Sequence, residues 1–249
     1  MPDALPNLQS DFVDIPPGEA LLGSLKHPER FAPVRMKISR PFRMMKRVVT
    51  QREWRDVHGS EPWLKERKNY EKMLSRLPYG DELPALNLTQ VEAEAFAKEV
   101  GRRLGAPLSL VPEVFWEYAC RAGAAGDYYW GQKDAGAAHE WLRWGSGDAE
   151  IHPPAQLKPN AWGLFDMCGN VNELILDRYP DSNSFYIPAK HYARPVDFVA
   201  RKGPWTVLRS ANVMDTELSA GCGNKIINHS GSRQMFAGFR LAHIPWLSA

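Results

Sequence analysis

Alternating hydrophobic and polar positions predict several short strands. Residues 12–24 indicate a strand, a turn at Pro17-Gly18 and a second strand. Residues 34–38 alternate and predict another strand, as does the hydrophobic stretch 41–49. Near the C-terminus, residues 205–209 and 238–242 have the same character. The predicted strands therefore lie toward both ends of the chain, with a more helical region between them.

Two capping patterns predict helices. Thr50 is expected to cap a helix over residues 51–57, because a Thr oxygen at this position accepts an orphan backbone N–H. The sequence Thr89-Gln90-Val91-Glu92 is a capping box and predicts a helix from about Gln90 to Arg103. We expect the buried face of this second helix to contain Val91, Ala95, Phe96 and Val100.

Two further helices are expected. Pro112 favours a helix start and predicts a helix over 113–121 that ends at Gly123. A charged insert over residues 61–77 predicts an exposed amphipathic helix between Pro62 and Pro78. The insert is either a solvated surface segment or a partner surface; the candidate residues of that surface are Trp63, Lys65, Arg67, Lys68 and Lys72.

Composition suggests a loop-rich domain rather than a helical bundle. The 249 residues include 9 Trp, 20 Pro and 19 Gly, which favour an irregular backbone. We expect a flexible lead at 1–11 and a single domain at 12–249. The net charge of +2 argues against a nucleic-acid partner, and no apolar run has the length of a transmembrane helix.

One stretch carries a family resemblance. Residues 159–173, Pro-Asn-Ala-Trp-Gly-Leu-Phe-Asp-Met-Cys-Gly-Asn-Val-Asn-Glu, resemble the signature of the formylglycine-generating enzyme (sulfatase-modifying factor) family. Residues 112–123, the dipeptide Trp130-Gly131 and residues 238–242 resemble further family motifs in the same order. The resemblance implies an elaborated C-type-lectin-like α+β fold with little regular secondary structure.

The resemblance also shows what is missing. Family members of the formylglycine type bind copper(I) with two cysteines five residues apart, because thiolates suit this soft ion. Counting forward from Arg209 puts these positions at Asp215 and Ala220, whereas counting back from Gly238 puts them at Asn212 and Glu217. Neither alignment gives a cysteine, so the resemblance predicts a protein without copper and without this oxidation.

The three cysteines are Cys120, Cys168 and Cys222. Some family members have a structural disulfide at the positions that correspond to Cys120 and Cys222, and we expect that disulfide here. The alternative is a pair of buried thiols. Cys168 is expected to be left over. The bond would argue for an oxidising compartment such as the periplasm.

The resemblance implies one structural calcium site, formed by Asn170, the carbonyl of Val171 and Glu173. In the alternative interpretation, Asn170 and Glu173 hold the loop together by hydrogen bonds. A second family calcium site would fall near residues 138–144 and matches poorly. Arg240, in the Gly-Phe-Arg motif, is expected to form a buried ion pair that closes the domain.

Three functions follow as hypotheses. The first is a catalytically inactive family member that binds or regulates, such as a periplasmic regulator of the type VI secretion threonine-phosphorylation pathway (the TagR type). Its partner would be an envelope lipoprotein or a membrane kinase. The N-terminus shows no signal peptide, which fits an exported protein whose signal is removed, or a cytoplasmic one. The second is an enzyme with different chemistry that uses Asn212, Asp215, Glu217 and His229, and the third is a lectin-like ligand-binding protein with aromatic-rich loops.

Overall fold

The computed structural model describes residues 5–24, 28, 32–64, 78–131, 141, 150–180, 203–215 and 220–247. Its helices are α1 (Leu5–Ser10), α2 (Gln51–His58), α4 (Gln90–Leu104) and α5 (Glu113–Arg121), with a 3₁₀ turn η1 (Pro62–Leu64). Its strands are β1 (Phe12–Ile15), β2 (Gly18–Leu22), β3 (Val34–Ile38), β4 (Phe42–Met45), β5 (Leu108–Leu110), β6 (Asn172–Tyr179), β7 (Trp205–Arg209), β8 (Lys225–His229), β9 (Ala237–Gly238) and β10 (Leu241–His243). The mixture of helices and sheets confirms the predicted α+β class.

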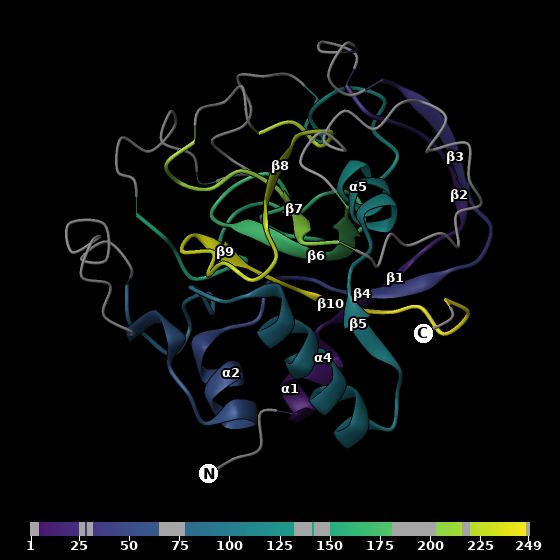
Figure 1. Ribbon diagram of the computed structural model, residues 1–249. Coiled ribbons are helices and arrows are strands. Elements are labelled where there is room, and N and C mark those ends of the chain that lie inside the picture. The colour runs from purple at the N-terminus through teal and green to yellow at the C-terminus, as the bar shows by residue number, and fades with distance from the viewer. Residues whose placement is uncertain are drawn as a thin grey trace.

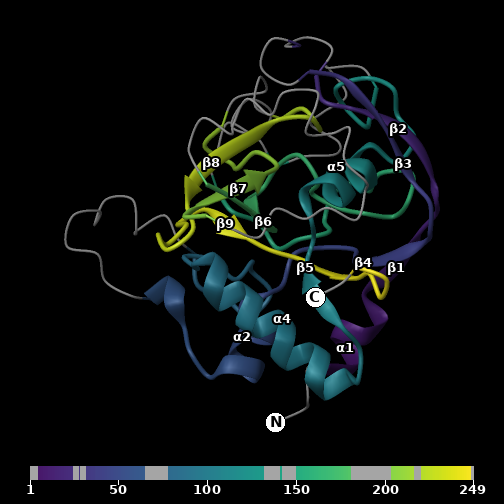
Figure 2. The same ribbon diagram turned by 45° about the vertical axis from the view of Figure 1, so that its right-hand side comes forward.

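The described strands form two four-stranded sheets and one two-stranded hairpin. The first sheet has the order β1-β4-β10-β5, so β10 from the C-terminal region lies between strands from the first half of the chain. The second sheet has the order β8-β7-β6-β9, and β2 pairs with β3. In both views, α1, α2 and α4 lie on one side of the first sheet, whereas α5 and the second sheet lie on the other (Figures 1 and 2).

The predicted caps of α2 and α4 are confirmed. The Thr50 hydroxyl accepts the backbone N–H of Glu53 at 3.3 Å, and the Glu53 carboxylate accepts the backbone N–H of Thr50 at 2.8 Å. Thr89 and Glu92 make the same reciprocal pair at 3.2 and 2.9 Å. Each helix ends at a left-handed glycine, which has no Cβ to oppose that conformation.

The predicted buried face of α4 is partly wrong. Val91 is 56% exposed and Ala95 is also exposed, whereas Phe96 and Val100 are buried as predicted. Ala93 and Ala97 complete the buried face, because positions three or four apart share one side of a helix. Val91 and Ala95 form a similar pair on the neighbouring, solvent-facing side.

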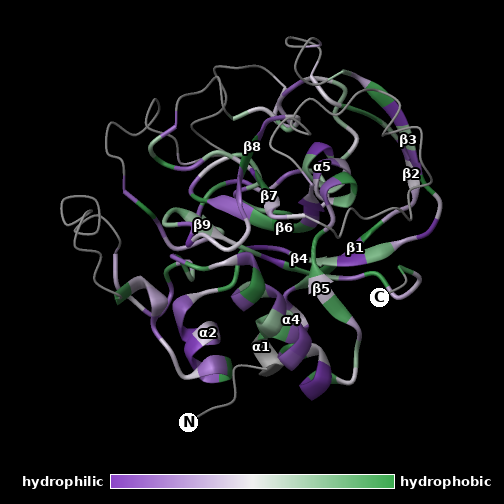
Figure 3. Cartoon of the chain, viewed as in Figure 1, coloured by the Kyte–Doolittle hydropathy of each residue, from purple (hydrophilic) through white to green (hydrophobic). Residues whose placement is uncertain are grey.

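The core between the helices and the first sheet contains an aromatic cluster among aliphatic side chains. The ring of Trp54 stacks on Phe96 with centroids 5.3 Å apart, and its edge meets Phe239 at 6.0 Å. In Figure 3, α2 is largely hydrophilic, in keeping with a helix that buries only one side. Within the described part of the chain, no helix is both long and apolar enough to cross a bilayer.

The strand predictions hold for β1, β2, β3 and β7, whose predicted stretches 12–24, 34–38 and 205–209 contain these strands, and they are only partly correct for 41–49 and 238–242. The stretch 41–49 forms only β4, and 238–242 is divided between β9 and β10 because Phe239 and Arg240 lie between them. The pattern did not predict β5, β6 or β8. Strand β6 is buried on both faces over its first six residues, so it shows no alternation of hydrophobic and polar positions.

Candidate functional site

The signature loop joins α5 to β6. Asn160 is central to it: its side-chain nitrogen donates to the carbonyls of Ala119 and Cys120, at 2.8 and 3.1 Å. Its side-chain oxygen accepts the N–H groups of Trp162 and Leu164, at 3.0 and 3.1 Å. One buried amide thus holds the C-terminal turn of α5 against the start of the signature.

Glu173, the acidic residue of the signature, makes a buried ion pair. Its two oxygens accept the Nη2 and Nε atoms of Arg240 at 2.6 and 2.8 Å, and Trp116 Nε1 donates to it at 2.9 Å. Arg240 also donates to the carbonyls of Lys46 and Phe165. The predicted ion pair that closes the domain is therefore confirmed.

Two of the three groups matched to a calcium site, the side chains of Asn170 and Glu173, are used in another way. The Asn170 side chain accepts the N–H of His152 at 3.1 Å and donates to its carbonyl at 3.0 Å. Both oxygens of Glu173 are occupied by Arg240, and a guanidinium at this distance opposes a cation. Glu173 therefore does not fit a calcium ligand set, and the hydrogen-bonding alternative accounts for Asn170 and Glu173. Residues 138–144, where the second family calcium site would fall, lie outside the described residues except for Trp141.

The loop that follows β7 contains the positions of the absent copper ligands. Asn212 is buried, and its side chain donates to Asn172 Oδ1 at 2.8 Å and accepts the N–H of Met214 at 2.8 Å. The carboxylate of Asp215 accepts the backbone N–H of Asn212 at 2.9 Å, and burial raises its pKa. Ala220 is buried, and Glu217 lies outside the described residues.

The pairing of Asn172 with Asn212 is informative. Asn172 stands where the family signature has an aromatic residue, and Asn212 is one of the two candidate first positions of the cysteine pair. The Asn172 amide also donates to the carbonyl of Ser210 at 2.9 Å. Two departures from the family pattern, 40 residues apart, therefore satisfy each other within one hydrogen-bonded cluster.

The candidate residues of the enzyme alternative are not all together. Asn212 and Asp215 are in contact, but His229 lies at the opposite end of the β7–β8 hairpin, where it pairs with Trp205. Because β8 has five residues, a separation on the order of 13 Å is expected along the strand.

A buried charge network in α5 escaped the sequence prediction. Glu117 accepts Arg121 Nε at 3.0 Å and Arg209 Nη2 at 2.6 Å, and Lys225 donates to Glu113 at 2.8 Å. These ionic side chains are at most 3% exposed. The i, i+4 spacing of Glu113, Glu117 and Arg121 on a predicted helix was the signal that could have found them.

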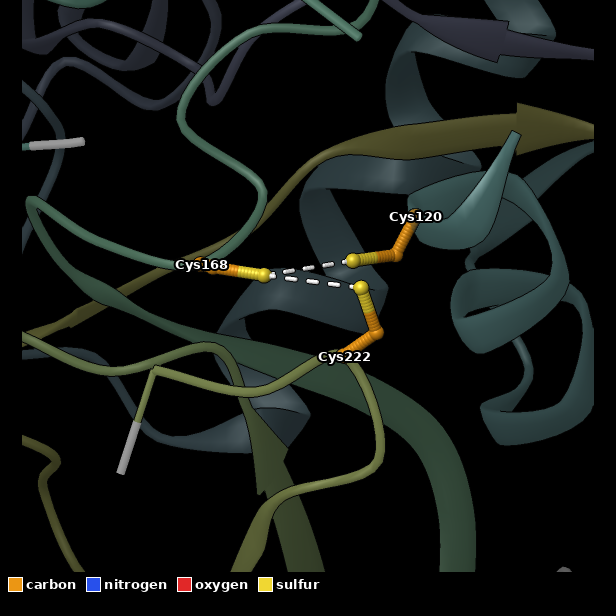
Figure 4. Close-up of side chains that lie close together, drawn as sticks. All are labelled: Cys120, Cys168 and Cys222. Carbon is orange, nitrogen blue, oxygen red and sulfur yellow. Dashed lines mark hydrogen bonds between the residues drawn. The ribbon is translucent and has the colours of Figure 1, made fainter. Parts of the chain in front are cut away.

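The three cysteines converge (Figure 4). Sγ of Cys168 lies 3.4 Å from that of Cys120 and 3.9 Å from that of Cys222, and the three sulfurs are within 4.8 Å of one another. All three are buried thiols in this structure. The disulfide expected between Cys120 and Cys222 is not formed in it, and the oxidised state of these two residues stays a prediction. Burial raises the pKa of the Cys168 thiol well above its ordinary value. Cys168, expected to be left over, lies between the other two.

The proposed partner surface needs a correction. Trp63 is only 4% exposed and packs in the core with Trp54 and Phe96, because an indole ring gains more from burial than from exposure. Lys65, Arg67, Lys68 and Lys72 lie outside the described residues, so the predicted helix of the insert is described only as far as η1. Leu64, beside Trp63, is 54% exposed.

Asp166 of the signature carries a pH-dependent prediction. Its side chain is buried, and only Oδ2 has a partner among the described residues, the N–H of Ala155 at 2.7 Å. Burial raises its pKa from 3.8 to about 6. Because the folded protein binds this proton more tightly than the unfolded chain, the free energy of unfolding should fall by about 3 kcal/mol as pH rises from about 4 to about 6.

The Asp166→Asn variant isolates this effect, since an amide keeps the bond to Ala155 and does not titrate. Urea unfolding of both proteins between pH 4 and 8 should give curves that diverge below about pH 6, with the wild type gaining stability as pH falls. Parallel curves across this range would show that Asp166 titrates normally.

Comparisons with known proteins agree with this geometry. Residues 2–244 match the family model of the sulfatase-modifying factor enzyme 1-like domain. The chain is 28% identical over 136 residues to the formylglycine-generating enzyme of Mycobacterium tuberculosis, covering 49% of this chain and 42% of that protein. It is 29% identical over 160 residues to the serine/threonine-protein kinase pkn1 of Chlamydia pneumoniae, covering 64% of this chain and 24% of the kinase. The chain thus spans less than half the length of either relative.

Two solved structures share the fold. The structure of PvdO from Pseudomonas aeruginosa has a TM-score of 0.75 at 21% identity and covers 93% of each chain. Treponema denticola variable protein 1 has a TM-score of 0.76 at 20% identity and covers 94% of this chain and 95% of its own. The family model spans nearly all of the sequence, and the chain therefore belongs to the sulfatase-modifying factor enzyme 1-like (FGE-sulfatase) family.

Proposed function

We propose that this chain is a family member without copper-dependent oxidation that serves as a binding or regulatory component. The observation that carries this proposal is the hydrogen bond between Asn212 and Asn172, 2.8 Å long and buried in the loop after β7. The Asn212 side chain uses its donor and acceptor groups within the protein, and amide and carboxylate oxygens are hard ligands that suit copper(I) poorly.

The cysteine cluster supports the alignment behind this proposal. Counting back from Gly238 places the copper positions at Asn212 and Glu217, and the same count makes Cys222 the structural neighbour of Cys120. The sulfurs of these two residues lie within 4.8 Å of each other, as that count requires. The forward count gives Asp215 and Ala220, and neither of these is a thiol either.

The kind of partner is suggested by a relative. The match to part of the Chlamydia protein named as a serine/threonine-protein kinase is consistent with a role of such domains near kinase signalling. The more specific form of the proposal is a periplasmic regulator of the TagR type, which acts on an envelope lipoprotein or membrane kinase. The charged insert at 61–77 supplies the candidate partner surface. Because Trp63 is buried, that surface now consists of the basic residues of the insert alone.

The test of lost oxidation is a peptide assay. Purified protein incubated with a Cys-x-Pro-x-Arg peptide, copper(I), oxygen and a thiol reductant should give no formylglycine by mass spectrometry, because the two thiolate ligands are absent. The formylglycine-generating enzyme of Mycobacterium tuberculosis is the active control. Conversion above the level of a no-protein reaction would overturn the proposal.

The second part of the proposal, the binding or regulatory role, is tested by immobilising the purified protein and exposing it to envelope extracts. Retention of a kinase or lipoprotein should be lost when the basic residues of the insert, Lys65, Arg67, Lys68 and Lys72, are replaced by Ala. A matched variant replaces four exposed basic residues from elsewhere, Arg35, Lys37, Arg40 and Lys98. Equal retention by both variants would remove the insert from the proposal.

A further inference from the structure

The three cysteines come from distant parts of the chain. Cys120 lies in the last turn of α5, Cys168 in the signature loop and Cys222 in the turn before β8, and their side chains point toward one another (Figure 4). Each has 0% exposure. The chain has 3 cysteines in all, so every thiol of the protein is in this cluster.

The spacing of the sulfurs suits a metal ion. A d10 ion bound by three thiolates at about 2.3 Å holds the sulfurs about 3.8 Å apart in tetrahedral geometry and about 4.0 Å apart in a plane. The observed separations are 3.4 and 3.9 Å, with all three sulfurs within 4.8 Å. Small side-chain rotations are therefore enough to reach the bound geometry. A disulfide would instead bring two sulfurs to about 2.05 Å and leave the third without a role.

We propose that Cys120, Cys168 and Cys222 together bind one thiophilic ion, Cu(I) or Zn(II), in a buried structural site. Binding releases whichever protons the three cysteine side chains carry, and it requires no change of oxidation state. The site differs in position from the lost copper pair, because none of its ligands corresponds to Asn212 or Glu217. It would hold the end of α5, the signature loop and the approach to β8 together.

The surroundings favour the charge that such a site carries. The guanidinium of Arg121 acts electrostatically on the thiols of Cys120 and Cys222. Arg209 donates to the carbonyl of Cys222 at 2.9 Å. Glu117, which faces the same region, is already paired with both arginines. Two guanidinium groups thus share one carboxylate, and an excess of positive charge remains beside the cysteines. This charge favours a thiolate-bound ion, which carries a net negative charge.

The experiment measures metal in the intact protein. Reduced protein, reconstituted anaerobically with Cu(I) or with Zn(II), is passed through a desalting column and analysed by elemental analysis and native mass spectrometry. We expect one ion per chain and three thiols that resist alkylation until the protein is unfolded with a chelator. Comparing the two reconstitutions, and a direct competition between them, identifies the ion.

Two variants sharpen the test. Cys168→Ala should lower metal affinity by at least the roughly 10- to 100-fold that loss of an outer-sphere partner costs. Met167→Leu, a buried neighbour of similar volume, should keep one ion per chain. Co(II) substitution should give thiolate charge-transfer absorption in the wild type that is altered in Cys168→Ala.

Three outcomes would overturn the proposal. These are a Cys120–Cys222 disulfide in peptides mapped without reduction, reduced wild-type protein that binds neither ion, and a Cys168→Ala variant that binds as tightly as the wild type. None of these measurements depends on the formylglycine assay, so the two proposals can fail separately.

Discussion

The Glu117→Gln variant is expected to lose about 5 kcal/mol or more of stability, which is comparable with the whole stability of many domains. The Glu117 carboxylate accepts the backbone N–H of Gly23 at 2.6 Å, as well as both arginines of the network. Removing its charge takes away the carboxylate with which the buried Arg121 pairs, and leaves Arg209 with the longer pairing to Glu113, at 3.5 Å. The loss should appear as a large fall in the urea midpoint, or as an unfolded far-ultraviolet circular dichroism spectrum at neutral pH.

The same chain offers a matched control. Glu99 also accepts bonds from two arginines, Arg102 and Arg103, but on the exposed surface of α4. Water solvates these charges when the partner is removed, so Glu99→Gln should unfold like the wild type. If Glu117→Gln behaved like Glu99→Gln, the buried network would not be a source of stability.

The Glu173→Gln variant is expected to lose about 3–5 kcal/mol, since it leaves the guanidinium of Arg240 buried beside a neutral amide. Arg240 has 0% exposure and makes five of its hydrogen bonds to Glu173, Met45, Lys46 and Phe165. The measurement is urea unfolding of the variant and the wild type. We expect a lower midpoint at an unchanged slope of the unfolding free energy against urea concentration.

A double-mutant cycle separates the ion pair from its individual residues. Arg240→Met removes the cation, and the double variant with Glu173→Gln leaves no uncompensated charge. The double variant should therefore lose less stability than the two single variants together. Additive losses would show that the two side chains act independently, in contradiction to the 2.6 Å contact between them.

The two ionic clusters meet at one tryptophan. Trp116 donates its indole N–H to Glu173, and the guanidinium of Arg209 lies over its ring at 5.1 Å from the centroid. Helix α5 therefore carries one cluster and contacts the other, with Trp116 between them. A variant at either cluster should weaken the packing of α5 against β6 and β7.

Local features of the fold could be read from the sequence because their causes are local. The Thr50 and Thr89 caps act over three residues, and the strands β2 and β3 follow from patterns within short segments. The signature loop identified the family, and the Gly-Phe-Arg motif indicated the ion pair of Arg240. Once the resemblance placed the copper positions, the sequence also showed that neither alignment has a cysteine there.

The other features of the fold and of the candidate site were decided by contacts between segments that are distant in the sequence. Strand β6 is buried on both faces, so periodicity could not reveal it, and β10 reaches its place between β4 and β5 only through the tertiary fold. The bond of Asn172 to Asn212 joins residues 40 positions apart, and the pairing of Glu117 with Arg209 joins residues 92 positions apart. The thiol of Cys168 meets thiols that lie 48 and 54 positions away in the chain. Sequence patterns report the neighbours of a residue within a few positions, whereas the chemistry of a buried group is set by whichever distant side chains the packed core places beside it.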